Sequence, residues 1–490
     1  MKHWKEQRRD RVANPQHHSR QPSPKPCLGG DSPAAMRKRV LIPPAILCIC
    51  YAVLSVYTLH RLGFLHHLSE VFFSTPDSIG YGAVSDYLIG VGNRPMGIGE
   101  GTVEYIALRP FFYPLVLSAH HLTGATGFVL FQALLNLGTL VLVFLAVYRM
   151  TRSAWVSSAA FVAVLLYPTF TFVALHALPE TLCLFLTAAV VFCIASFCLH
   201  PNKPALFISL FLLSCAVCSR PCFLPFFALW AAFTAVWVCR ETVKRKGQRT
   251  RGLAIAVPAL ILSVSPVVFQ LAQTYRSIGQ ATISTAGREN FDIRFFPAVY
   301  GYAEDNRFIG YEEAEANQAR LLYPTHSAKV RYIVAHCGAT ARAAAVILFE
   351  NLTAGSIHAG YPEEFIRDSA LYKRIYRLST FMNRYGLPVH AGFLLLLPVS
   401  LFMFRKDPGL LWLCVALETL TCSILLLSFL SYWQGDRLVI SALPAWVVLY
   451  ASAGHGLLLR LAGIHPRKGA VEESQPGRER PPAGANGSPV

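Results

Sequence analysis

Long apolar runs alternate with short polar segments from residue 40 to residue 460. A helix that spans a membrane needs about 20 consecutive apolar residues. Nine runs are close to that length, at 40–59, 128–148, 154–175, 181–199, 222–239, 253–274, 386–404, 409–431 and 438–459, and a shorter one lies at 205–219. The pattern predicts an all-α polytopic membrane protein with about ten transmembrane helices.

The apolar stretch 105–122 has two interpretations, because it contains Arg109, two prolines and the pair His120 and His121. It is either an eleventh span or a helix that lies in the membrane interface. Basic residues favour the cytoplasmic side. With ten spans, the basic segments lie on the cytoplasmic side. They are the N-terminus and residues 149–152, 200–203, 240–251, 405–406 and 467–468. An eleventh span would move most of them outside, so we expect an outer juxtamembrane helix.

This topology divides the chain into five parts. Two tails, 1–39 and 461–490, are polar and are expected to be disordered in the cytoplasm. The N-terminal membrane module covers 40–274 and includes a first outer loop at 60–127, and the C-terminal helices cover 386–460. Segment 275–385 is too long for a plain connector. Its helical and irregular aromatic stretches predict a mixed extracytoplasmic subdomain.

Composition supports a membrane protein and excludes other classes. Only 14% of residues are charged and 54% are hydrophobic, whereas soluble proteins carry about 25% charged residues. A disordered chain, a collagen-like repeat and a disulfide scaffold are also excluded. The net charge of +17 comes from basic residues beside apolar runs. That position indicates membrane orientation rather than a nucleic-acid partner.

Charged residues near the predicted outer ends of the spans need an explanation. Burying one ionised side chain at membrane depth costs at least about 2.5–3.5 kcal/mol. A single arginine there is commonly an anchor that reaches the interface. A group of them predicts a cleft for an anionic or polar substrate. The group comprises Asp77, Asp86, Glu104, Arg109, Glu180, Arg220, Asp436 and Arg437.

Two carboxylates each have two possible roles. Asp77 follows Pro76 and precedes Ser78, so it is either a turn or cap residue or a catalytic group. Glu418 lies in the middle of a predicted span. It is either a buried carboxyl paired with a polar neighbour or part of a proton relay in a transporter. The sequence contains no phosphate-binding loop, zinc-protease helix or nucleophile elbow.

Several short motifs occur in a fixed order along the chain. Asp77 is followed four positions later by Tyr81, and the segment from Arg109 to Leu115 reads Arg-Pro-Phe-Phe-Tyr-Pro-Leu. Later motifs are Tyr167-Pro168, Pro179-Glu180-Thr181-Leu182, Ser219-Arg220-Pro221, and Arg437 followed by Pro444. Over residues 40–460 this order resembles the GT-C superfamily of membrane glycosyltransferases, the protein O-mannosyltransferase and lipid A aminoarabinose transferase type.

The resemblance implies inverting transfer of a sugar from a polyprenyl-phosphate donor to an acceptor at the extracytoplasmic face of the plasma membrane. The acceptor is a glycan, a lipid or a protein. The module 40–274 would then be catalytic, with Asp77 as the base. The implied substrate-binding residues are Tyr81, Glu104, Arg109, Tyr113, Glu180, Arg220 and Arg437. No cofactor and no metal are expected, since many relatives have two adjacent acidic residues where this chain has Asp77 and Ser78.

Two other classes of function remain open. A polytopic lipid or solute transporter, such as a flippase, would use Glu418 and the arginines along a pathway. Its charged residues should occupy both halves of the membrane, whereas here they favour one side apart from Glu418. A non-catalytic scaffold that binds a partner through its outer subdomain would leave the charged group unexplained.

Overall fold

The structure, a computed structural model, describes residues 33–91, 107–199, 202–244, 249–310, 313–355, 366–405, 407–430 and 435–462. Within these residues the backbone forms helices and loops, and no β-strand. Those from Pro43 onward belong to one compact unit, whose boundary with the other unit lies at Ile42. The all-α prediction is therefore confirmed for the described part of the chain.

Seven helices in this part are long and apolar enough to cross a membrane. They are α2 (Pro33–Leu62), α7 (His120–Thr151), α10 (Glu180–Leu199), α12 (Leu224–Lys244), α13 (Arg249–Ile278), α20 (Pro408–Ser428) and α21 (Leu443–Leu461). Two bent helix pairs raise the number of candidate spans to nine. These helices indicate a multi-pass membrane protein, as the hydropathy pattern predicts.

The predicted span 154–175 is a broken helix. α8 (Ala154–Leu165) meets α9 (Pro168–Phe172) and the short η2 (Val173–Leu175) at an angle of 69°. Pro168 opens α9, where its missing N–H leaves no hydrogen bond unmade. The residue before a proline is disfavoured in helical conformation, and Tyr167 is extended, with φ −83° and ψ 104°. The proline therefore accounts for the break.

Two further helices correspond to predicted spans, and one bent pair lies outside them. α11 (Lys203–Val217) matches the predicted run 205–219 and is apolar but short. α19 (Ser369–Phe404) contains the predicted span 386–404, whose side chains lie largely outside the described residues. The second bent pair, α17 (His326–Ala335) and α18 (Cys337–Thr353), turns by 99° within the predicted subdomain.

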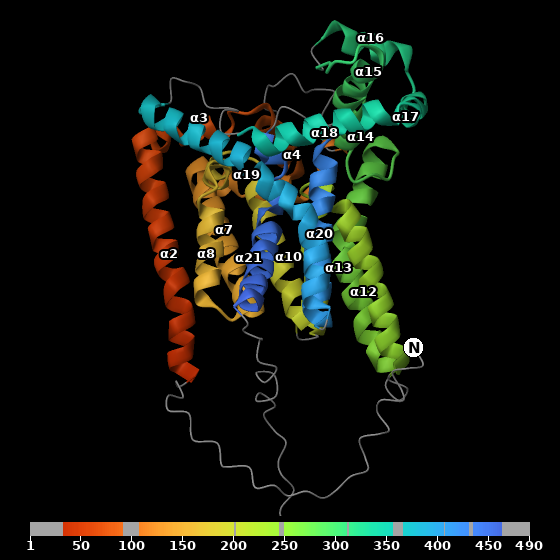
Figure 1. Cartoon of the computed structure of the whole chain (residues 1–490). Coiled ribbons are helices and arrows are strands. Elements are labelled where there is room, and N and C mark those ends of the chain that lie inside the picture. The colour runs from red at the N-terminus through yellow and green to blue at the C-terminus, as the bar shows by residue number, and fades with distance from the viewer. Residues whose placement is uncertain are drawn as a thin grey trace, which may run out of the picture. The chain divides into compact units, whose positions relative to one another are not determined.

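Helix α10 forms the centre of the bundle. It packs against α7, α11, α20 and α21. Figure 1 shows α7, α20 and α21 beside it. Most of its side chains are apolar and buried around its whole circumference, as expected for a helix surrounded by others. α2 instead exposes many large apolar side chains, and such a surface suits contact with lipid.

Short helices connect the spans at the end of the bundle where α10 begins and α11 ends. They are η1 (Phe64–His66), α3 (Leu68–Phe72), α4 (Pro76–Leu88), α6 (Phe112–Leu117), η3 (Pro221–Phe223), η6 (Gly435–Leu438) and η7 (Ile440–Ala442). The segment 105–122 is not one continuous helix. Its described part contains α6 and the start of α7, which Gly124 interrupts with a positive φ of 69°.

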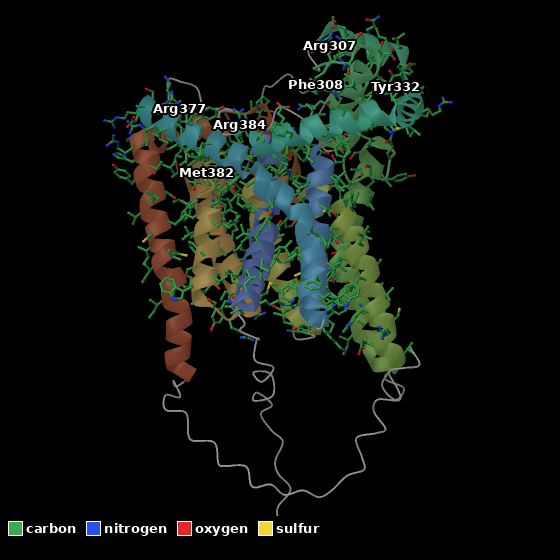
Figure 2. All side chains as sticks on the ribbon, in the orientation of Figure 1. Arg307, Phe308, Tyr332, Arg377, Met382 and Arg384 are labelled. Atoms are coloured by element: carbon green, nitrogen blue, oxygen red, sulfur yellow. The ribbon has the colours of Figure 1, made fainter. Side chains whose placement is uncertain are left out.

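The described part of the predicted subdomain is helical. It comprises α14 (Ala286–Asn290), η4 (Phe291–Phe295), α15 (Phe296–Glu304), α16 (Ala314–Leu322), α17 and α18. Phe296, Tyr323 and Tyr332 pack together in its small core, and Figure 2 shows Tyr332 on α17. The aromatic residues from 291 to 302, in a part of the chain where irregular structure was expected, therefore lie in helices. α18 packs against α19, α20 and η6.

Gly409 permits a close contact between two spans. A Cβ atom added at Gly409, at the start of α20, would lie 2.6 Å from the carbonyl oxygen of Cys198 in α10. A backbone atom cannot rotate away, so the two helix ends would have to separate. We predict that Gly409→Ala lowers the free energy of unfolding by roughly 1–3 kcal/mol, measured by thermal unfolding in detergent.

Gly454 in α21 provides a matched control, because a Cβ atom added there meets nothing within 4 Å. Alanine is the better helix former by about 1 kcal/mol, so Gly454→Ala should leave the unfolding midpoint unchanged or raise it. Equal losses of stability in both variants would show that the contact between α10 and α20 is not specific.

Candidate functional site

A carboxylate between two arginines joins three distant segments of the chain. Asp77 lies in the first turn of α4. Arg109 Nη2 donates a hydrogen bond to Asp77 Oδ1 at 2.5 Å, and Arg437 Nη2 donates to Asp77 Oδ2 at 2.7 Å. The side chains of Asp77, Arg109 and Arg437 are only 20%, 21% and 11% exposed. Both oxygens of Asp77 therefore hold guanidinium groups in a largely buried place.

Glu180 connects this group to a third arginine. It is the first residue of α10 and its side chain is fully buried. Arg437 Nε donates to Glu180 Oε1 at 2.5 Å, and Arg220 Nη1 lies 3.7 Å from the same oxygen. We call Asp77, Arg109, Glu180, Arg220 and Arg437 the ionic cluster. Its three positive and two negative charges leave an excess of one positive charge.

All five members of the ionic cluster line one cavity of about 340 Å³. Ligand pockets in proteins commonly have volumes of about 300–1,000 Å³ and combine apolar walls with a few convergent polar groups. The wall of this cavity has that character. Its apolar members include Leu108, Pro110, Pro179, Pro221, Leu224, Ile283, Leu427, Leu430 and Leu438.

The sequence around Asp77 forms a helix start that directs its carboxylate toward the arginines. Thr75 caps α4: its Oγ1 accepts the Ser78 N–H at 3.0 Å, and Ser78 Oγ accepts the Thr75 N–H at 3.1 Å. Pro76 occupies the first helical position. Since Thr75 and Ser78 make the cap, the alternative role of Asp77 as a cap residue is excluded. A carboxylate in a first helical turn is also stabilised by the helix dipole.

Gln270 supports the segment that carries Arg109. It is buried in α13, where its Oε1 accepts the backbone N–H of Phe111 and its Nε2 donates to the carbonyl of Ile283, both at 2.9 Å. Ser284 Oγ donates to the carbonyl of Leu108 at 2.6 Å. The Gln270 side chain thus joins α13 to the segment before α6 and to the segment before α14. Both segments contribute to the wall of the cavity. Gln270 is not among the site residues that the sequence predicts.

Asp436 anchors the turn that carries Arg437. Its Oδ2 accepts hydrogen bonds from Thr169 Oγ1 at 2.6 Å and from Asn383 Nδ2 at 2.9 Å. Asp436 is fully buried and does not line the cavity. Arg220 Nη1 donates to the backbone carbonyl of Arg437 at 3.2 Å. These bonds fix η6 against α9, α19 and the end of α11.

Two tyrosines lie beside the ionic cluster. The guanidinium carbon of Arg109 lies 4.8 Å from the centre of the Tyr81 ring, which is a cation–π distance. Tyr81 lines the cavity, and its ring meets that of Tyr113 edge to face at 5.1 Å. Tyr113 is buried behind Tyr81, and its hydroxyl has no hydrogen-bond partner among the described residues. Burial raises the pKa of both phenols.

The electrostatics of the ionic cluster keep Asp77 ionised. Burial opposes ionisation of this carboxyl group, but the charges of Arg437 and Arg109 outweigh burial and hold the pKa of Asp77 well below its usual range. Burial acts against the charge on Arg437 as well, yet Glu180 and Asp77 raise its pKa overall. Asp77 is therefore a weak base while both arginines are bonded to it.

The structure brings most of the predicted site residues together. Asp77, Tyr81, Arg109, Glu180, Arg220 and Arg437 line the same cavity, and Tyr113 supports Tyr81. Glu104 lies outside the described residues. Glu418 is buried in α20 and does not line the cavity. Missed residues of the cavity wall include Thr282, Ala286 and Asn290.

Comparison with known proteins adds no relative. No protein-family model, no curated protein and no solved structure matches the chain. The chemistry of the cavity is therefore inferred from its own geometry and from the motif order.

The ion pairs of Asp77 predict how stability depends on pH. Because the folded-state pKa is lowered, the stabilisation is complete above the ordinary pKa of aspartate, about 3.9. It is lost as the pH falls toward the folded-state pKa. Removing one partner of a buried ion pair lowers the free energy of unfolding by roughly 3–5 kcal/mol. We predict that Asp77→Asn is less stable than wild type at neutral pH by about that amount.

Thermal unfolding of both proteins in detergent between about pH 7 and pH 3 measures this dependence. The difference between them should begin to shrink below about pH 4, because the unfolded wild-type chain then binds a proton at Asp77 while the folded chain keeps this carboxylate ionised. A difference that stays constant over the whole range would contradict an ionised Asp77 between two arginines.

Proposed function

We propose that the chain is an integral-membrane glycosyltransferase. It would transfer a sugar from a polyprenyl-phosphate donor to a glycan, lipid or protein acceptor, with inversion at the anomeric carbon. The observation that carries the proposal is the ionic cluster in an apolar-walled cavity at one end of the spans. The order of motifs, which resembles the GT-C type, supports the same chemistry.

The arginines suit the phosphate of the donor. A guanidinium presents paired N–H donors in a plane, which matches the oxygens of a phosphate. The Arg109 Nε atom is buried and has no hydrogen-bond partner among the described residues. The excess positive charge of the ionic cluster favours an anion in the cavity. We assign Arg109, Arg220 and Arg437 to the phosphate, and the apolar wall to the adjoining lipid.

Asp77 is the proposed base. The acceptor hydroxyl oxygen forms a bond to the anomeric carbon as the bond from that carbon to the phosphate oxygen breaks. The phosphate leaves with the electron pair, and the hydroxyl proton passes to Asp77. Binding of the donor phosphate would draw Arg109 or Arg437 away from Asp77. One carboxylate oxygen would then be released, and its basicity would rise.

The remaining residues have supporting roles in this proposal. Glu180 holds Arg437 and Arg220 in place from the start of α10. Tyr81 offers an aromatic face at the cavity wall for the sugar, and Tyr113 supports it. Glu104 is assigned to the substrate only as a member of the charged group near the predicted outer ends of the spans. The proposed topology has ten spans with outer juxtamembrane helices and places the cavity at the extracytoplasmic face of the plasma membrane.

Transfer by the purified protein in lipid vesicles tests the proposal. The probes are labelled polyprenyl-phosphate mannose and polyprenyl-phosphate aminoarabinose, offered with an envelope extract as the source of acceptor. We predict that Asp77→Asn lowers the transfer rate at least about a hundredfold, because the base is lost. Arg437→Lys should lower it roughly a hundredfold, because an ammonium cannot serve Glu180, Asp77 and phosphate together.

Arg307 provides the matched control. It lies in the helical subdomain (Figure 2) and pairs with Glu313 and Glu315 at 2.7 and 2.9 Å, so it resembles Arg437 in having two acidic partners. It is 44% exposed and does not line the cavity. Arg307→Lys should keep wild-type transfer. Lipid translocation without sugar transfer would refute the enzyme and support a transporter.

A further inference from the structure

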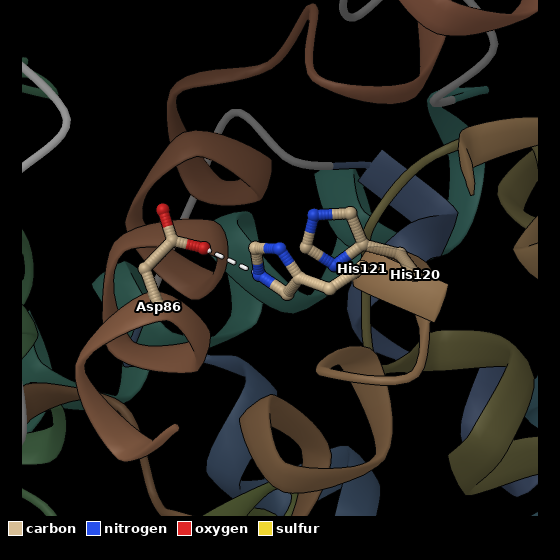
Figure 3. A group of neighbouring side chains, drawn as sticks. All are labelled: Asp86, His120 and His121. Carbon is tan, nitrogen blue, oxygen red and sulfur yellow. Dashed lines mark hydrogen bonds and ion pairs between the residues drawn. The ribbon is translucent and has the colours of Figure 1, made fainter. Parts of the chain in front are cut away.

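A second polar cluster lies on α4 and α7. Asp86, near the end of α4, and His120 and His121, at the start of α7, each offer a ligand atom, and these atoms lie within 4.8 Å of one another. His121 Nε2 lies 2.8 Å from Asp86 Oδ1, and the ring centres of His120 and His121 are 4.0 Å apart. Figure 3 shows the ring of His121 between the carboxylate and His120. We call these residues the histidine cluster.

The orientation of His120 matches that of a metal ligand. Its Nδ1 lies 2.8 Å from the backbone carbonyl of Leu117. A carbonyl only accepts hydrogen bonds, so Nδ1 carries the proton and Nε2 is left with its lone pair. Histidines that bind metals commonly donate their other ring N–H to a carbonyl or carboxylate in this way.

The histidine cluster is more enclosed than an ordinary surface ion pair. Asp86 and His120 are 5% and 6% exposed. The ring of His120 also packs against the rings of Phe73 and Phe72, with distances between ring centres of 5.4 and 6.1 Å. An apolar wall beside a carboxylate and two imidazoles strengthens their attraction for a cation. Two nitrogens and one carboxylate oxygen form a ligand set suited to a divalent transition metal.

We propose that Asp86, His120 and His121 bind one zinc ion. Neutral imidazole nitrogens and an aspartate oxygen are common zinc ligands, and three protein ligands leave a fourth position for water. Binding requires that the hydrogen bond between His121 and Asp86 be replaced by bonds from both residues to the metal.

The zinc ion has a structural role in this proposal. Asp86 lies nine residues after Asp77 on α4. Nine residues make about two and a half turns and about 14 Å of helix, so the two residues lie on opposite sides of α4. Asp86 does not line the cavity. The metal would therefore join the last turn of α4 to α7 without taking part in the chemistry of the ionic cluster. This inference does not depend on the proposed function.

Zinc binding to the full chain, purified in detergent without a histidine tag, tests the inference. After dialysis against a chelator, zinc alone is added back, and metal content is measured by mass spectrometry. Wild type should retain one zinc ion per chain. His121→Gln and Asp86→Asn should each weaken zinc binding roughly tenfold or more. His121 is 21% exposed, so its glutamine variant is expected to fold.

His326 supplies the matched control. It lies 3.5 Å from Asp292, a histidine–aspartate pair of similar kind, but is 44% exposed. It does not belong to the histidine cluster. His326→Gln should keep wild-type zinc content. Zinc should raise the unfolding midpoint of wild type and of His326→Gln, but not of His121→Gln. If wild type retains no zinc, or if all variants retain the same amount, the cluster is an ion pair and the inference is wrong.

Discussion

The cost of burying charge governs this structure. None of the three side chains Asp77, Arg109 and Arg437 is more than about a fifth exposed, and an isolated charge in such a place is strongly unfavourable. Each charge is offset by another that comes from a distant part of the chain. Pairing therefore brings α4, the segment before α6, the start of α10 and η6 to one end of the bundle. The cavity is the space that these segments enclose.

The same ion pairs make phosphate binding compete with the ion pairs of the proposed base, Asp77. A phosphate in the cavity and the carboxylate of Asp77 would share the donors of Arg109 and Arg437. Without an anion, the arginines stabilise Asp77 in its ionised form and occupy both its oxygens. With an anion, one carboxylate oxygen becomes available. α4 carries Asp77 at its start and Asp86 near its end, so one short helix links the ionic cluster to the histidine cluster.

Hydropathy predicts most spans because lipid-facing and buried helices are both apolar. It predicts the site residues because ionised side chains at span ends require partners. Other features give weaker signals. Pro168 marks the break before α9, although the run around it contains no charged residue. Gln270 is one of two amides in an apolar run, and its partners are backbone groups of other segments. Asp86 and His121 are 35 residues apart, so no motif spacing joins them.

The most direct test of the central claim is an experimental structure of the chain in a lipid disc with a polyprenyl monophosphate. The phosphate should occupy the cavity, accept hydrogen bonds from Arg109 and Arg437, and leave one oxygen of Asp77 without an arginine partner. The account is contradicted if the phosphate binds elsewhere, or if Asp77 and Arg437 lie on different faces of the membrane.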